Sequence, residues 1–177
     1  AVELKLVLSD DLTAENLEEV LGSVSGIVVA PGFGERGIEG KVVAAKFARL
    51  REVPYLGLCL GMQVMVIELA RHAFESEDAN STEFNPTTPH PVIDLMVSQQ
   101  DVEDKGGTMR LGLYPARLIE GSKVRALYGE ELIYERHRHR YEFNDEYRGQ
   151  LEGAGLWCSG TSPDNGLVEF VLVFERP

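Results

Sequence analysis

The sequence has few cysteines, few basic residues and no long apolar run. Its two cysteines, Cys59 and Cys158, are too few for a disulfide framework, so we expect a reducing compartment. Lys and Arg number 17 against 29 Asp and Glu, a formal net charge of −12. This balance argues against nucleic-acid and membrane-surface binding, because both need a basic face. The longest charge-free stretches, 20–34 and 53–67, are too short and too interrupted by glycine and proline to span a bilayer.

What the sequence does contain suits one globular domain. A chain of 177 residues with 44% hydrophobic residues can bury a sizeable core. No internal repeat, linker or low-complexity segment divides it, so we predict a single domain over residues 1–177. The first residues do not have the pattern of a signal peptide, and we therefore expect a cytoplasmic protein.

Strands and helices alternate through the first half of the chain. The patterns predict strands at 2–8, 27–30 and 54–58 and helices at 13–21, 41–51 and 62–74, with Thr13 as the candidate cap of the first helix. The apolar run 27–30 is typical of a fully buried strand. Later strands are predicted at 114–118, 138–143, 156–161 and 168–174, and loops at 78–91 and 106–112. This order predicts βαβ units and a parallel central sheet.

The sharpest local signal is Gly57-Leu-Cys-Leu-Gly61, where a buried strand runs into a helix. A nucleophile in such a turn sits on a strained backbone, and small residues two positions away on each side relieve the crowding. The helix N-terminus favours the thiolate of Cys59 over the thiol. A small buried cysteine in a strand-end turn is the alternative. The strand before the motif and the helix after it favour the nucleophile. Cys158, beside Trp157 in a predicted strand, is interpreted as a core thiol.

Two further segments carry candidate functional groups. The loop 31–34, Pro-Gly-Phe-Gly, follows another buried strand. In a parallel sheet it would converge with Cys59 and aim backbone N–H groups at an oxyanion, although the segment by itself is better explained as a plain turn. The segment 136–140, Arg-His-Arg-His-Arg, would in extended form place three arginines on one face and two histidines on the other. A solvated edge strand explains this pattern best, a carboxylate or phosphate site is the functional alternative, and a metal site is not expected.

These motifs together resemble one family. The chain is similar to the glutaminase domain of CTP synthase, a class I (triad-type) glutamine amidotransferase. Residues 57–63 look like the family's nucleophile motif, and 33–40, 78–84, 106–112 and 135–142 look like motifs particular to CTP synthases. The match runs from near residue 10 to near residue 170. The resemblance implies an α/β fold of three layers, in which helices flank a mostly parallel, flavodoxin-like central sheet.

The resemblance also implies a reaction. Cys59 attacks the side-chain amide carbon of L-glutamine, ammonia leaves, and water hydrolyses the thioester. The matching positions assign the oxyanion hole to the backbone N–H groups of Gly32 and Leu60. They assign glutamine binding to Gly32, Leu60, Gln63, Glu83 and Arg140, and no residue to a metal. A carboxylate suits the ammonium of glutamine and a guanidinium its carboxylate.

In this family the ammonia passes to an amidoligase domain, which uses ATP and Mg²⁺ to aminate UTP to CTP in pyrimidine biosynthesis. GTP activates the glutaminase, and the loop matching 106–112 is implicated in that control. The resemblance therefore implies L-glutamine and a CTP synthase amidoligase domain as partners, within a homo-tetramer of the full enzyme. It implies no cofactor within the glutaminase domain itself, and neither nucleic acid nor membrane as a partner.

Two departures from the family pattern matter. The chain reads Ala-Pro-Gly-Phe-Gly at 30–34 where the family has Pro-Gly-Gly-Phe-Gly. Pro31 lacks an N–H and fixes its φ, so we expect a differently shaped loop in which Gly32 keeps its donor. The family's His-Pro-Glu motif, which supplies the general base and its orienting glutamate, is missing between Phe170 and Phe174. A general base typically contributes ~10²–10⁴-fold in rate.

We interpret the second departure as a segment missing from this stretch of sequence. The alternative is a catalytically inactive amidotransferase-like binding or regulatory module that has lost its base. A third possibility is another cysteine hydrolase on the same fold. A His-x-Glu between Phe170 and Phe174 in the uninterrupted sequence would favour the enzyme over the module. Labelling of Cys59 by a glutamine-like electrophile, with protection by glutamine, would argue against another hydrolase.

Overall fold

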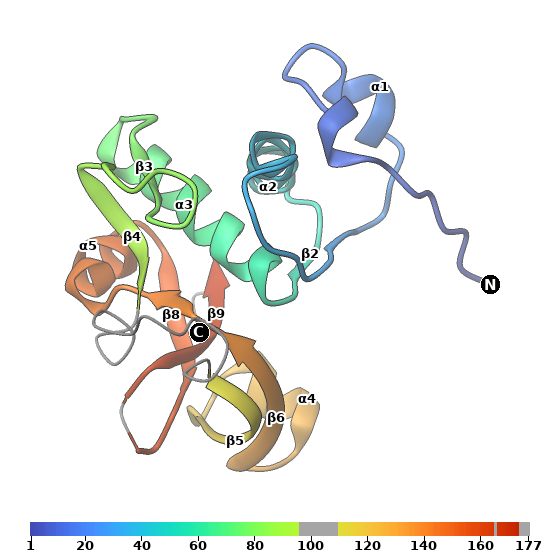
Figure 1. Ribbon diagram of the computed structural model, residues 1–177. Helices are drawn as coiled ribbons and strands as arrows, with labels where there is room; N and C mark the ends of the chain where they lie inside the picture. The colour runs from blue at the N-terminus through green and yellow to red at the C-terminus, as the bar shows by residue number, and fades with distance from the viewer. Residues whose placement is uncertain (96–109, 165, 174–177) are drawn as a thin grey trace.

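The computed structural model describes residues 1–95, 110–164 and 166–173. Helical segments are η1 (Ser9–Asp11), α1 (Leu17–Leu21), α2 (Ile38–Arg51), α3 (Leu60–Phe74), α4 (Lys123–Tyr128), η3 (Asp145–Tyr147) and α5 (Arg148–Gly153). The strands are β1 (Ile27–Val29), β2 (Tyr55–Gly57), β3 (Ala79–Ser81), β4 (His90–Leu95), β5 (Arg110–Leu118), β6 (Leu132–His139), β7 (Tyr141–Phe143), β8 (Leu156–Thr161) and β9 (Val168–Val173). Figure 1 shows their arrangement. None of the helices in these ranges has the length and apolar character that a bilayer crossing requires.

The strands of the described residues form three sheets. β1 and β2 pair in parallel; β3 and β4 are parallel, with β7 antiparallel to β4; and β6, β5, β8 and β9 form an antiparallel sheet in that order. The α/β class is confirmed, whereas parallel pairing is limited to β1–β2 and β3–β4 and does not extend through one central sheet. Short connections explain the difference: only residues 162–167 join β8 to β9, too few for the crossover that a parallel pair needs.

Helix α3 is the centre of the core. Leu60, Val64, Val66, Ile67 and Leu69 are each at most 1% exposed, so the helix is buried on nearly all sides. It contacts α2, α5, β1, β2, β3 and β4, and Figure 1 shows it running between α2 and β4. Because Cys59 immediately precedes this helix, its position is fixed by the best-packed element of the molecule.

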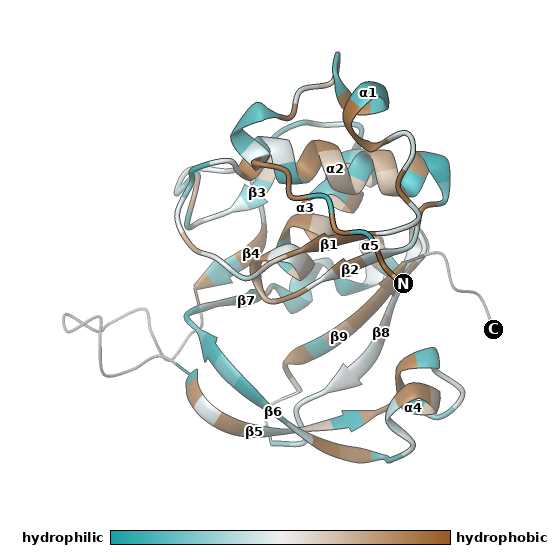
Figure 2. Ribbon diagram, turned by 90° about the vertical axis from the view of Figure 1, so that its right-hand side faces the viewer, coloured by the Kyte–Doolittle hydropathy of each residue, from teal (hydrophilic) through white to brown (hydrophobic). Residues whose placement is uncertain are grey.

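The N-terminal segment differs from its predicted structure. Val2, Leu4, Leu6 and Leu8 are 70–94% exposed, and residues 1–8 join none of the sheets of the described chain, so the strand expected there is wrong. A segment in which apolar and polar residues alternate forms a strand only where the edge of another strand is free to pair with it through backbone hydrogen bonds. The chain is attached instead through a small apolar cluster centred on Leu12, Leu21, Ala44 and Phe47, which packs η1 and α1 against α2. Figure 2 shows the apolar character of this end of the chain.

Several predicted boundaries shift by a few residues. α2 and α3 begin at Ile38 and Leu60, earlier than expected, and α1 begins after Asn16 rather than after Thr13. β1 is less buried than predicted: Val28 is 66% exposed, and among the described strands β1 pairs with β2 alone.

In the middle and the C-terminal part of the chain, the observed strands and loops also differ from the predicted ones. The predicted loop 78–91 contains β3 and the start of β4, whereas the predicted strand 156–161 matches β8. The predicted strand 138–143 is split between β6 and β7. Of the predicted loop 106–112, residues 106–109 lie outside the described residues.

Candidate active site

Cys59 lies in the turn between β2 and α3, with backbone angles φ 56° and ψ −108°. A positive φ is uncommon for a residue with a side chain and marks local strain. The flanking glycines make the turn possible: a Cβ on Gly57 would lie 2.4 Å from the carbonyl carbon of Gly61, and a Cβ on Gly61 would lie 2.3 Å from the carbonyl oxygen of Val29. The structure therefore has the strained strand-to-helix turn that the spacing predicts.

Two backbone N–H groups hydrogen-bond to the side chain of Cys59. They belong to Leu60, the first residue of α3, and to Gly32, which follows β1. A Cβ on Gly32 would lie 3.0 Å from Leu60 Cδ2, so the two donors are neighbours. The proline at position 31 does not turn the Gly32 N–H away from the sulfur. The structure thus brings together the residues that the resemblance assigns to an oxyanion hole.

His139, the last residue of β6, lies near enough to Cys59 for each to shift the pKa of the other, and it contacts Glu142. Its Nδ1 lies 3.4 Å from Glu142 Oε1, and the two side chains are 14% and 5% exposed. Burial by itself would lower the pKa of His139, but the hydrogen bonds with Cys59 and Glu142 outweigh burial and raise the pKa to about 10. Burial would likewise raise the pKa of Cys59, but His139 and the two backbone N–H groups lower it. The arrangement favours a thiolate–imidazolium pair.

A buried charge network lies behind this pair. Arg110, at the start of β5, pairs with Glu169 of β9 and lies 3.5 Å (Nη1 to Oε1) from Glu142 of β7. His137 Nδ1 is 3.5 Å from Glu169 Oε2 and 3.3 Å from His139 Nδ1. Burial and the charges of Arg110 and His139 lower the pKa of His137 to about 4, so this imidazole is neutral at neutral pH. Burial raises the pKa of Glu169, with Arg110 opposing the shift.

The three residues assigned to glutamine binding but not to the oxyanion hole each interact with Tyr141, one by a hydrogen bond and two through their charges. Gln63 Nε2 donates to the carbonyl oxygen of Tyr141 at 2.8 Å. The pKa of Tyr141 is raised by burial and by the carboxylate of Glu83, while the nearby Arg140 cation lowers it, so both charges lie close to this ring. Glu83 Oε1 also accepts the backbone N–H of Gly34 at 2.8 Å. The loop after β1 is thereby tied to the proposed substrate site.

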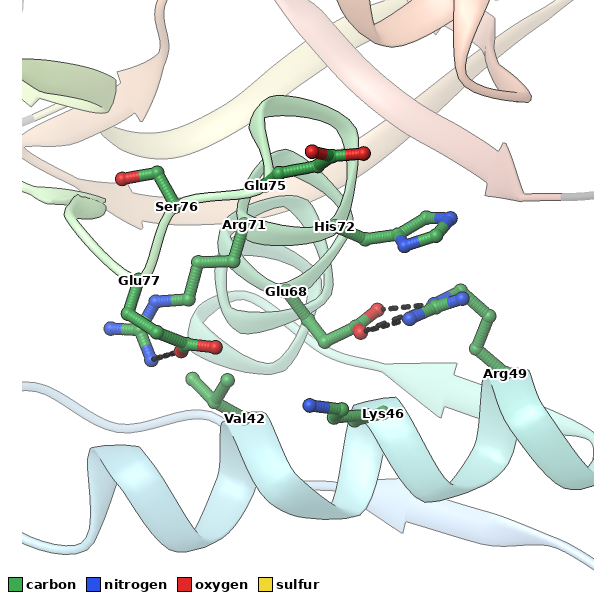
Figure 3. A pocket seen from close by; sticks show the side chains of 9 residues that line it. All are labelled: Val42, Lys46, Arg49, Glu68, Arg71, His72, Glu75, Ser76 and Glu77. Carbon is green, nitrogen blue, oxygen red and sulfur yellow. Dashed lines mark hydrogen bonds and ion pairs between the residues drawn. The ribbon is translucent and has the colours of Figure 1, made fainter.

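A separate cavity between α2 and α3 is lined by charged side chains (Figure 3). Arg49 Nη2 lies 2.8 Å from Glu68 Oε1, with side chains that are 13% and 5% exposed. Arg71 Nη1 lies 2.7 Å from Glu39 Oε2. These charges pair across the two helices, and the cavity lies beside the middle and end of α3 rather than at Cys59. We assign it a structural role.

The second cysteine has no comparable setting. Cys158 is 3% exposed within the main apolar core, and burial raises the pKa of its thiol to about 12. The prediction of a core thiol is confirmed. Within the ranges 1–95, 110–164 and 166–173, no three or more His, Cys, Asp or Glu side chains are grouped as a metal site would require.

Sequence reasoning missed His139, Glu142 and Tyr141 as site residues. The alternation of residues 136–140 placed His137 and His139 on one face, and β6 does point both inward while Arg136 and Arg138 are exposed. What the pattern could not reveal is that β6 ends beside Cys59, 80 residues earlier in the chain. That proximity depends on long-range packing.

Comparisons with known proteins agree with this geometry. The family model "Glutamine amidotransferase class-I" matches residues 1–173. The chain is 56% identical over 176 residues to a CTP synthase of Moorella thermoacetica and 54% identical over 176 residues to one of Shouchella clausii, covering 99% of this chain and 33% of each relative. The solved structure described as "Trypanosoma brucei CTPS - glutaminase domain with bound acivicin" is similar with a TM-score of 0.85 and 37% identity, covering 97% of this chain and 66% of that one.

The chain therefore spans about a third of the length of these curated relatives. The family match over residues 1–173 includes the turn that holds Cys59. The chain belongs to the class I glutamine amidotransferase family.

Proposed function

We propose that residues 1–177 form the glutaminase domain of a CTP synthase, a single glutamine amidotransferase domain that hydrolyses L-glutamine through a thioester on Cys59. One observation carries the proposal: Cys59 occupies a strained strand-to-helix turn (φ 56°) at the start of α3, where the backbone N–H groups of Gly32 and Leu60 and the side chain of His139 lower its pKa. The curated relatives, whose similarity extends over 99% of the chain, are CTP synthases, which supports this choice among amidotransferases.

Recognition of glutamine is assigned to the groups around Tyr141. The carboxylate of Glu83 suits the ammonium of the substrate, and the guanidinium of Arg140 suits its carboxylate. In this proposal the two charges, both of which act on the pKa of Tyr141, hold the two ends of the substrate. Gln63, bonded to the carbonyl oxygen of Tyr141, connects this site to the first turn of α3 and so to Cys59.

The chemistry follows from the groups at Cys59. The thiolate attacks the side-chain amide carbon of glutamine, and the carbonyl oxygen becomes an oxyanion. The N–H groups of Gly32 and Leu60, which already face the sulfur, are placed to stabilise that charge; one such donor is typically worth ~10²–10³-fold in rate. The carbon–nitrogen bond then breaks, ammonia leaves, and water hydrolyses the thioester to glutamate.

The ammonia is proposed to serve an amidoligase domain outside this chain, which aminates UTP to CTP with ATP and Mg²⁺ in a homo-tetrameric enzyme activated by GTP. The relatives support this assignment by their name and by their length, of which the chain covers 33%. The loop expected to respond to GTP falls largely outside the described residues, so its role stays a prediction. A cytoplasmic location is proposed on the same grounds.

The test is ammonia release from L-glutamine by the whole chain and by its Cys59→Ala variant. We expect release by the wild type and none above background by the variant, because the thioester cannot form. The matched control is Cys158→Ala, which removes the other thiol from the core, far from the reaction. If Cys59→Ala retains wild-type ammonia release, the assignment of Cys59 is wrong.

An inactive binding or regulatory module is the second candidate, favoured by the missing His-Pro-Glu motif. It predicts that glutamine binds, as measured by calorimetry, but is not converted to glutamate. The two candidates are separated by measuring heat of binding and glutamate formation on the same preparation.

A further inference from the structure

We propose that Glu83 is also a positioning residue: its carboxylate holds the loop of residues 30–34, here called the oxyanion loop, and so keeps the N–H of Gly32 beside Cys59. The inference deepens the proposed function and rests on it. Because the same carboxylate is proposed to receive the ammonium of glutamine, one side chain connects recognition of an α-amino acid to stabilisation of the oxyanion.

The oxyanion loop has few features of its own that fix its shape. It follows β1 without forming a helix or strand, and most of its residues are exposed, Phe33 to 91%. Gly34 has φ 76°, and nothing lies within 4 Å of the place where its Cβ would be. Pro31 has no N–H to donate. Since glycine has no strong preference for one backbone conformation, hydrogen bonds decide where the N–H of Gly32 points.

One such hydrogen bond reaches the oxyanion loop from a distant part of the chain. The N–H of Gly34 donates to Glu83 Oε1 at 2.8 Å. Among the residues that the structure describes, this is the one hydrogen bond made by Pro31, Phe33 or Gly34. Because Gly34 is two residues from Gly32, a displacement of Gly34 also moves the donor at Gly32.

Glu83 itself is attached to the core. It lies just after β3, and its N–H donates to the hydroxyl of Ser81 at 3.1 Å; Ser81 is fully buried. The N–H of Thr82 donates to the carbonyl oxygen of Ile93 in β4 at 3.0 Å, and its hydroxyl donates to Asp94 Oδ1 at 2.6 Å. The strand β3 also contacts α3. The turn that carries Glu83 is therefore a fixed point to which the oxyanion loop is attached.

On its other side the oxyanion loop is close to the turn of Cys59. A Cβ on Gly32 would lie 3.0 Å from Leu60 Cδ2, and the N–H of Leu58 donates to the carbonyl oxygen of Val29 at 3.0 Å. The N–H of Gly32 also lowers the pKa of the Cys59 thiol. Since hydrogen bonds weaken steeply with poor distance and angle, a small displacement of the loop is enough to weaken this donor.

The Glu83 carboxylate can serve the loop and the substrate together. It has two oxygens with about four acceptor sites; Oε1 accepts the N–H of Gly34, and Oε2 is left for the ammonium of glutamine. Two substitutions separate these roles. Glu83→Asp keeps the charge but loses about 1.5 Å of reach, the length of one carbon–carbon bond. Glu83→Gln keeps the reach and an acceptor oxygen but loses the charge.

The first experiment measures kcat and KM for ammonia release from L-glutamine by the whole chain and by both variants. We expect Glu83→Gln to have the higher KM, because the charge that receives the ammonium is gone. We expect Glu83→Asp to have the lower kcat, by about tenfold, because complete removal of one oxyanion donor costs ~10²–10³-fold. Glu77→Asp and Glu77→Gln are the matched controls, on a carboxylate that is 81% exposed, and should leave both constants unchanged.

The second experiment needs no turnover. The rate at which iodoacetamide alkylates Cys59 is measured against pH by peptide mass spectrometry, for the wild type and for Glu83→Asp. The two proteins carry the same charge, so a difference between them reports the position of the Gly32 donor. We expect the inflection to rise by about half a unit in Glu83→Asp, which lowers the thiolate fraction at pH 7 about threefold.

Circular dichroism shows whether each variant is folded. If Glu83→Asp is unfolded, Glu83→Ala takes its place and is compared with Glu83→Gln, since both lack the charge and differ in reach. A folded Glu83→Asp overturns the inference if it keeps the wild-type alkylation profile or has a kcat as high as that of Glu83→Gln. Either result leaves the glutaminase function standing. Failure of the wild type to release ammonia would instead overturn the proposed function, and the alkylation profiles would still decide whether Glu83 holds the loop.

Discussion

At the residue scale, the candidate site depends on one pair of opposite charges. Burial opposes it, but Cys59 and Glu142 raise the pKa of the His139 imidazole to about 10, and His139 in turn lowers the pKa of the Cys59 thiol. Because each charge stabilises the other, the two groups titrate as a coupled pair. A bell-shaped pH profile of ammonia release follows. The rate falls at acid pH as the thiolate is protonated, and it falls above about 10 as His139 loses its proton.

Glu142 provides the prediction that belongs to this scale. Its carboxylate raises the pKa of His139, so Glu142→Gln should lower that pKa and move the alkaline limb of the ammonia-release profile toward neutral pH. The Cys59 inflection in alkylation should rise, but by less than in His139→Asn, because the imidazole is still present. Glu152→Gln, on α5, is the control. If the alkaline limb of the ammonia-release profile does not move in Glu142→Gln, then Glu142 does not position His139.

At the scale of elements, the site exists because α3 approaches β1 closely behind Cys59. Gly61 packs against Val29 so tightly that a Cβ would lie 2.3 Å from the Val29 carbonyl oxygen. A larger residue must separate the helix from the strand. The loop that carries Gly32 follows β1 directly, so the same displacement would move one of the two donors away from the sulfur.

Gly61→Ala is therefore expected to destabilise the fold by roughly 1–3 kcal/mol, the usual cost of overpacking. Urea unfolding followed by circular dichroism measures the change. The control is Gly149→Ala in α5, where nothing lies within 4 Å of the new Cβ and helix propensity favours alanine. A Gly61→Ala variant as stable as the wild type would contradict the close approach.

The sequence predicted those structural features that depend on residues close together in the chain. The glycines at 57 and 61 and the apolar residues after them correctly predicted a strained turn and a buried helix. The alternation of residues 136–140 correctly separated the arginines from the two histidines, and the edge strand expected there is β6. The strand expected at 2–8 failed because alternation cannot supply a pairing partner, and those residues are exposed. The proximity of His139 to Cys59 was missed because it depends on how the chain passes from β6 to β7.

At the scale of the whole molecule, four distant segments meet at one place. Gly32 and Cys59 follow the two parallel strands β1 and β2, Glu83 follows β3, and His139 ends β6. The first three lie in the part of the chain where strands and helices alternate; parallel pairing of β1 with β2 brings Gly32 and Cys59 together, and the hydrogen bond from the Gly34 N–H to Glu83 joins the third segment to them. The fourth residue, His139, comes from the antiparallel sheet, which the alternation of predicted strands and helices did not indicate.

The central claim is that this convergence forms a glutamine site around a reactive Cys59, and covalent labelling tests it most directly. The whole chain is incubated with a chloroketone analogue of glutamine at neutral pH, and the modified peptide is identified by mass spectrometry. The account predicts modification at Cys59, none at Cys158, and slowing of the reaction by added L-glutamine. Modification at an equal rate in the presence of saturating glutamine, or at Cys158 instead, would contradict it.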